Sequence, residues 1–161
     1  MKKVNIYLWS SVKSLKSAET LNEAVGYIIQ SQTSKGPAEV GETVLLTDIC
    51  EKVTANQSEL IALKLALRRI NIKCELHVYT ECQYLASSIE NGWLEEWKAH
   101  AWKTKNGKEC ANKDEWQQLD ELLIGHEIHF HTKEPHEFKN WLRAEVEENR
   151  EFIKRESKDD N

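Results

Sequence analysis

The sequence predicts an α/β domain built on a five-stranded mixed sheet flanked by helices. Three observations lead to this fold class. Three apolar segments joined by short polar links occupy the first 50 residues, which favours an antiparallel meander. An amphipathic helix then leads into an alternating strand, a step that implies parallel pairing through a right-handed crossover. Finally, a fifth strand precedes a long terminal helix.

The N-terminal segments show strand periodicity. Val4, Ile6 and Leu8 alternate with polar or aromatic residues, which indicates a buried strand over residues 4–9. The following residues are polar and rich in lysine, and we expect a short helix near 17–23. The second and third strands are expected at residues 24–32 and 42–50, on either side of a turn at 34–37.

The rest of the chain alternates helices and strands. Leu60, Leu63 and Leu67 fall on one helical face, and Asn56 or Ser58 is the expected N-cap of that helix. Further strands are expected at 74–80 and 127–132, and further helices at 83–89, 94–101 and 116–124. Pro135 suits the first turn of a final helix that runs to about residue 154.

Length and composition bound the function classes. A chain of 161 residues is long enough for one domain, expected over residues 1–156, with a disordered tail at 157–161. Four widely spaced cysteines without a CxxC pair predict free thiols in a cytoplasmic protein. No segment has the length of a membrane span. A net charge of -5 argues against bulk electrostatic coating of nucleic acid but permits local basic patches.

Three motifs carry the functional information. The first is Thr54-x-Asn56-x-x-Glu59-Leu60, at the start of a helix, and the second is Tyr79-Thr80-Glu81-Cys82-Gln83-Tyr84, at the end of a strand. The third is a tryptophan- and lysine-rich stretch from Trp93 to Asp120. Together with the order of elements, these motifs resemble ribonuclease H of the bacterial type 1 class, whose basic protrusion, or handle, matches the third motif.

The resemblance implies a ribonuclease H-like fold and a metal-dependent site. Members of the family cut the RNA strand of an RNA–DNA hybrid with two magnesium ions held roughly 3.5–4 Å apart. Magnesium requires near-octahedral oxygen coordination, so the family supplies four carboxylates. They lie at the end of the first strand, in the first helix, at the end of the fourth strand and at the start of the last helix.

This chain keeps two of these four positions. Glu59 matches the first-helix position, and Glu81 matches the fourth-strand position with one extra methylene group. Trp9 stands at the first-strand position, and the last position falls on Asn140 or Trp141. We therefore expect Glu59 and Glu81 to be residual catalytic residues and, at most, weak metal ligands.

The resemblance also implies a nucleic-acid-binding surface. Asn56 and Gln83 match family residues near the sugar–phosphate backbone, and the handle adds tryptophans, lysines and an asparagine. The predicted nucleic-acid-binding residues are Asn56, Gln83, Trp93, Trp97, Lys98, Trp102, Lys103, Lys105, Lys108 and Asn112.

The leading interpretation is a ribonuclease H-like protein with a degenerate, impaired site that binds an RNA–DNA hybrid with modest affinity. One alternative is an active hybrid nuclease using Mg²⁺ or Mn²⁺, with Glu134 or Glu137 replacing a lost acid and His136 replacing a loop histidine. Another is a protein–protein adaptor of unknown partner. His129 and His131 alternate on one strand face, and without an evident third ligand we interpret them as a structural or surface pair.

Overall fold

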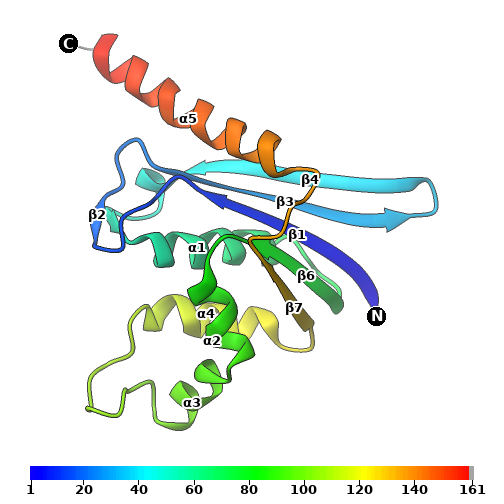
Figure 1. Ribbon diagram of the computed structural model, residues 1–161, viewed down its shortest axis with the longest axis vertical. Helices are drawn as coiled ribbons and strands as arrows, with labels where there is room; N and C mark the ends of the chain where they lie inside the picture. The colour runs from blue at the N-terminus through cyan, green and yellow to red at the C-terminus, as the bar shows by residue number, and fades with distance from the viewer. Residues whose placement is uncertain (160–161) are drawn as a thin grey trace.

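A computed structural model describes residues 1–159 and, within them, side chains to residue 150. Five strands form one sheet, in the order β4-β3-β1-β6-β7 (Figure 1). These strands are β1 (Lys2–Ser10), β3 (Ala24–Thr33), β4 (Gly36–Leu45), β6 (Cys74–Thr80) and β7 (Glu127–Thr132). The β1–β3 and β3–β4 pairs are antiparallel, whereas β1–β6 and β6–β7 are parallel. The predicted five-stranded mixed sheet is confirmed.

Helices cover both faces of the sheet. Figure 1 shows α5 on one side and the other four helices on the opposite side. The helices are α1 (Ala55–Leu67), α2 (Gln83–Glu90), α3 (Trp93–Ala99), α4 (Lys113–Leu123) and α5 (Lys139–Asp159). No helix in the described part of the chain is long and apolar enough to cross a membrane.

The alternation of β1 divides the core into two clusters. Ile6 and Leu8 belong to the large cluster that includes the buried face of α1, whereas Tyr7 and Trp9 belong to or pack against the smaller cluster beneath α5. Helix α5 lies close to the sheet at Gly26 of β3, where an added Cβ atom would come within 2.8 Å of Val146. Because successive side chains of a strand point to opposite faces, Leu8 faces α1 while Tyr7 and Trp9 face α5.

Two N-terminal predictions were wrong. The helix expected near residues 17–23 is replaced by β2 (Ala18–Glu19), which pairs with β5 (Lys52–Val53). Thr20 donates its hydroxyl to the carbonyl of Cys50 at 2.6 Å, and this contact holds the segment extended. The third predicted strand, β4, begins at Gly36 rather than residue 42, because its pairing with β3 starts directly after a tight turn. It ends at Leu45 and is followed by the 3-10 helix η1 (Leu46–Asp48).

Two helix termini also differ from expectation. Thr54, rather than Asn56 or Ser58, caps α1, and its hydroxyl oxygen accepts the Gln57 amide hydrogen at 3.0 Å. The last helix begins at Lys139 instead of Pro135, because the amide of Phe138 donates to the His136 ring at 3.2 Å in a separate turn. The predicted tail at 157–161 falls on α5, which continues to Asp159, and on two residues outside the described range.

Candidate functional site

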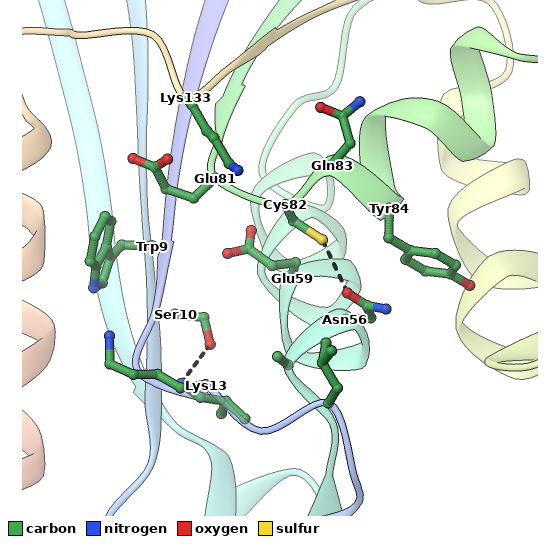
Figure 2. Close-up of a pocket in the computed structure, with 13 residues that line it drawn as sticks. Trp9, Ser10, Lys13, Asn56, Glu59, Glu81, Cys82, Gln83, Tyr84 and Lys133 are labelled. Carbon is green, nitrogen blue, oxygen red and sulfur yellow. Dashed lines mark hydrogen bonds between the residues drawn. The ribbon is translucent and has the colours of Figure 1, made fainter.

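A pocket of about 380 Å³ opens where the carboxyl ends of β1 and β6 meet the start of α1. Parallel strands place their carboxyl ends at the same edge of a sheet, and this edge is where open α/β sheets bind ligands. Its lining includes Trp9, Asn56, Glu59, Glu81 and Gln83, so residues that are distant in sequence surround one opening (Figure 2). We call this opening the cleft.

Glu59 is the buried acid of the cleft. It lies in the second turn of α1 and is only 7% exposed. Burial, against the lowering effect of a hydrogen bond donated by Thr80 at 3.0 Å and with a smaller raising effect of the Glu81 charge, raises the pKa of its carboxyl group to about 7. A carboxyl group with this pKa exchanges a proton near neutral pH.

Glu81 is the accessible acid of the cleft. It follows the last residue of β6, and its side chain is 34% exposed. The ammonium group of Lys139, the first residue of α5, lies 2.5 Å from its carboxylate. Glu81 is therefore neutralised by a side chain from the helix that begins next to it.

Trp9 occupies the end of β1. Its indole packs against the cluster beneath α5 and also lines the cleft. The Arg143 guanidinium lies 5.8 Å from the ring centroid, within the range of a cation–π interaction. The indole nitrogen Nε1 is buried and has no hydrogen-bond partner within the described residues. This position offers no oxygen ligand.

The remaining lining mixes apolar residues such as Val12 and Leu15 with polar and basic ones. Asn56 accepts a weak hydrogen bond from Cys82, whose thiol pKa is raised to about 11 by burial, and Gln83 is exposed at the start of α2. Lys13 and Lys133 also line the cleft, as Figure 2 shows. Sequence reasoning missed both lysines and Lys139. Lys133 directly follows β7, and its place next to a strand end is the signal that was available.

The donor set does not fit a two-magnesium centre. Such a centre needs several convergent carboxylates around two ions. The cleft offers one carboxyl group that is partly protonated near neutral pH and one that is paired with an ammonium group. The indole of Trp9 fills the place where the family's bridging carboxylate is expected.

The residues at the lost fourth carboxylate position and the candidate replacements for it lie in different settings. Asn140 and Trp141 are exposed on the first turn of α5, outside the cleft lining. Glu134 and His136 line a small cavity together with Trp9 and Glu81. The carboxylate of Glu134 lies 2.6 Å from His131, however.

His136 and Glu137 are also engaged. The His136 ring packs against both Tyr7 and Tyr79, at centroid distances of 4.6 and 5.5 Å. Burial and the nearby Lys139 lower the pKa of the His136 imidazole, so it is largely neutral near pH 7. Glu137 accepts a hydrogen bond from Gln30 at 2.8 Å.

The α3–α4 region (residues 93–123) carries the other predicted nucleic-acid-binding residues. Trp97 and Trp102 pack against the large core cluster, while Trp93 is 39% exposed. Asn112 donates to the Tyr84 hydroxyl at 3.4 Å, which connects this region to the cleft lining. Most of the tryptophan area therefore anchors the region to the body of the domain.

The lysines of this region differ in their charge environment. Lys98 is paired with Asp120 at 3.0 Å and with Glu95 at 3.5 Å. Lys103, Lys105 and Lys108 are exposed, and none has an ion pair within the described part of the chain. These three lysines are therefore available to phosphate groups, and they lie outside the cleft lining.

Comparison with known proteins agrees with this architecture. The chain is 44% identical over 75 residues to ribonuclease H of Francisella philomiragia, covering 47% of this chain and 49% of the relative. It is 41% identical over 83 residues to ribonuclease H of Ralstonia nicotianae, covering 52% of this chain and 54% of the relative. These alignments span about half the length of the curated relatives.

Solved structures share the fold at low sequence identity. A crystal structure of a type 1 RNase H with the type 2 active-site motif superposes with a TM-score of 0.64 at 17% identity, covering 89% of this chain and 68% of the other. The RNase H domain of PFV has a TM-score of 0.57 at 19% identity, covering 91% and 90%. The sequence profile of the RNase H family matches residues 5–151. The chain therefore belongs to the ribonuclease H family.

Proposed function

We propose that this protein binds RNA–DNA hybrids through the cleft and the α3–α4 region but has lost most two-metal hydrolysis. The observation that carries the proposal is the pairing of Glu81 with Lys139 beside the indole of Trp9. A cationic side chain takes the position at which a metal ion would neutralise the carboxylate. The family relationship and a solved relative, LC11-RNase H1 in complex with an RNA/DNA hybrid, support the substrate class.

Binding of the hybrid would depend on lysine side chains rather than on metal ions. Lys13, Lys133 and Lys139 surround the cleft, and Lys103, Lys105 and Lys108 extend the basic surface along the α3–α4 region. Each lysine that contacts a phosphate releases counterions, so affinity should be modest and fall steeply with salt. The four free cysteines are compatible with the reducing cytoplasm, and one domain over residues 1–156 suffices for this role.

The test separates binding from cleavage. A labelled RNA–DNA hybrid is incubated with purified protein in Mg²⁺, in Mn²⁺ and in EDTA, and its anisotropy and integrity are both measured. We expect binding in all three solutions and negligible cleavage. Efficient cleavage that disappears in Glu81→Ala would overturn the proposal. If Glu134→Gln also removed that activity, Glu134 would be the replacement acid of an active nuclease.

A second candidate, a protein–protein adaptor, is favoured by one observation. Trp141 is 56% exposed and lines an apolar groove with Ile28, Val40 and Phe138, between β4 and the start of α5. This groove is separate from the lysines. Hybrid binding that is unchanged in the Lys103→Glu/Lys105→Glu variant at low salt would favour the adaptor.

A further inference from the structure

A row of imidazoles runs along β6 and β7, from Glu75 near the start of β6 to Glu134 after β7. The parallel register pairs Glu75 with Glu127, His77 with His129 and Tyr79 with His131. Because residues two apart share a face, all of these side chains project from one face of the sheet. The His77 and His129 rings stack at 5.0 Å, and the His77 and His131 rings at 5.2 Å.

Short polar contacts connect this row from end to end. His77 Nε2 lies 2.7 Å from a Glu75 carboxylate oxygen, and His77 Nδ1 lies 2.9 Å from His131 Nε2. His131 Nδ1 lies 2.6 Å from the carboxylate of Glu134. His129 adds a third metal-binding side chain, since one ligand atom from each of Glu75, His77 and His129 lies within 4.8 Å of the others.

The number of protons in this row is informative. Its three contacts, from Glu75 through His77 and His131 to Glu134, need three N–H groups. Two neutral imidazoles supply only two, because each carries one N–H and one lone pair. Two neutral imidazoles therefore leave one of the three contacts without a hydrogen, and a metal ion in place of that hydrogen would satisfy it.

We propose that Glu75, His77 and His129 bind a divalent transition-metal ion of the Zn²⁺ class. The ion would bind a Glu75 carboxylate oxygen and His77 Nε2, which lie 2.7 Å apart and would move to the wider spacing of tetrahedral coordination. His77 Nδ1–H then donates to His131 Nε2, and His131 Nδ1–H donates to Glu134, so that two neutral imidazoles satisfy every remaining contact. A metal-bound histidine that passes its other N–H to a further acceptor is a common way of fixing ring orientation.

The ligand types and their mobility suit zinc. Two histidines and one carboxylate with water in a fourth position form a common zinc coordination set. His129 donates through Nε2 to Glu127 at 2.9 Å, which leaves its Nδ1 lone pair for the metal. Bonds of about 2.0–2.2 Å require ligand atoms closer together than 4.8 Å. His129 and Glu75 can move inward because their side chains are 45% and 35% exposed.

The site would join the edge strand β7 to β6. β7 is the last strand of the sheet, with one side unpaired within the described residues. Six residues separate Glu75 from Glu81 along β6, or about 20 Å at the rise of a strand. The metal site is thus distinct from the cleft, and it does not depend on the function proposed for the cleft.

Metal titration tests the inference directly. Protein freed of metal by chelator and dialysis is titrated with ZnCl₂ by calorimetry, alongside His129→Ala, Glu75→Gln and the control His100→Ala. His100 is an exposed histidine of the α3–α4 region, outside the row. We expect one zinc ion per chain for the wild type and the control, and at least tenfold weaker binding for His129→Ala and Glu75→Gln.

Cobalt identifies the ligands independently. Co²⁺ bound by imidazole and carboxylate gives visible d–d absorption without the charge-transfer band of a thiolate ligand. A thiolate band would assign the metal to cysteines and overturn the proposal. Absence of zinc binding in the wild type, or equal affinity in all four proteins, would also overturn it. Circular dichroism and the thermal midpoint without zinc establish that each variant is folded.

Discussion

The buried acid Glu59 makes the stability of this protein depend on pH in a direction opposite to that of most carboxylates. Burial raises its pKa from the usual 4.5 to about 7 in the folded state. The folded state therefore holds the Glu59 proton more tightly than the unfolded state does. The corresponding stability is fully present below about pH 4.5 and is lost as the pH rises toward 7. This difference corresponds to about 3 kcal/mol of unfolding free energy.

Glu59→Gln removes this dependence while keeping the shape of the side chain. Its amide oxygen can still accept the hydrogen bond from Thr80. At pH 5 the variant and the wild type should differ by no more than about 1 kcal/mol, the typical net value of one hydrogen bond. At pH 8 the variant should be more stable by about 2–3 kcal/mol, because the wild type must bury a charge there.

Urea unfolding at pH 5, 6, 7 and 8 measures this difference. Glu90→Gln is the matched control, since it removes a carboxylate from the exposed end of α2. Its difference from the wild type should stay nearly constant with pH. A Glu59→Gln difference that is equally flat would refute the reasoning, because it would mean that Glu59 ionises alike in the folded and unfolded states.

Three further changes test the cleft and the α3–α4 region. Lys103→Glu combined with Lys105→Glu should weaken hybrid binding for all sequences and reduce the slope of log affinity against log salt concentration. Lys98→Ala should have a smaller effect because Asp120 already neutralises Lys98. Lys139→Ala should change the unfolding free energy by less than about 1 kcal/mol, since its ion pair is partly exposed, yet weaken hybrid binding in anisotropy titrations, because it leaves the Glu81 carboxylate unpaired beside the cleft. Trp116→Ala should cost about 3–5 kcal/mol in urea unfolding, because the ring is fully buried and donates to Tyr84.

The fold was predictable because its periodicities are strong. Alternation in β1 and β6 and the helical stripe of α1 predict these elements, and burial in β6 alternates as predicted. Burial in α1 is wider than the stripe, because it is continuous from Ser58 to Lys64. The short elements were not predictable in this way. β2 and β5 have two residues each, so their pairing depends on contacts between segments more than 30 residues apart.

The acidic residues of the site could be predicted from the sequence, but its lysines could not. Glu59 and Glu81 sit in local motifs that fix their places on α1 and after β6. Lys139 reaches Glu81 only because the segment before α5 turns separately and the helix starts four residues later than Pro135 suggests. The imidazole row was missed for a related reason. Two of the proposed ligands, Glu75 and His77, come from β6, and only the register of β6 with β7 brings them to His129.

The charges of the cleft connect its chemistry to its proposed role. A two-metal site brings several positive charges to the phosphodiester, and its carboxylates are there to hold those ions. In this cleft Lys13 and Lys133 bring positive charge directly, Lys139 neutralises the Glu81 carboxylate beside it, and Glu59 gains a proton as the pH falls through 7. Such a cleft can attract a phosphate backbone without metal, because ammonium groups neutralise phosphates. Its donor set would not hold the two ions that activate water and stabilise a leaving oxygen in a two-metal site. The same substitutions that remove metal coordination therefore preserve attraction for nucleic acid, which is why loss of hydrolysis and retention of binding are expected together.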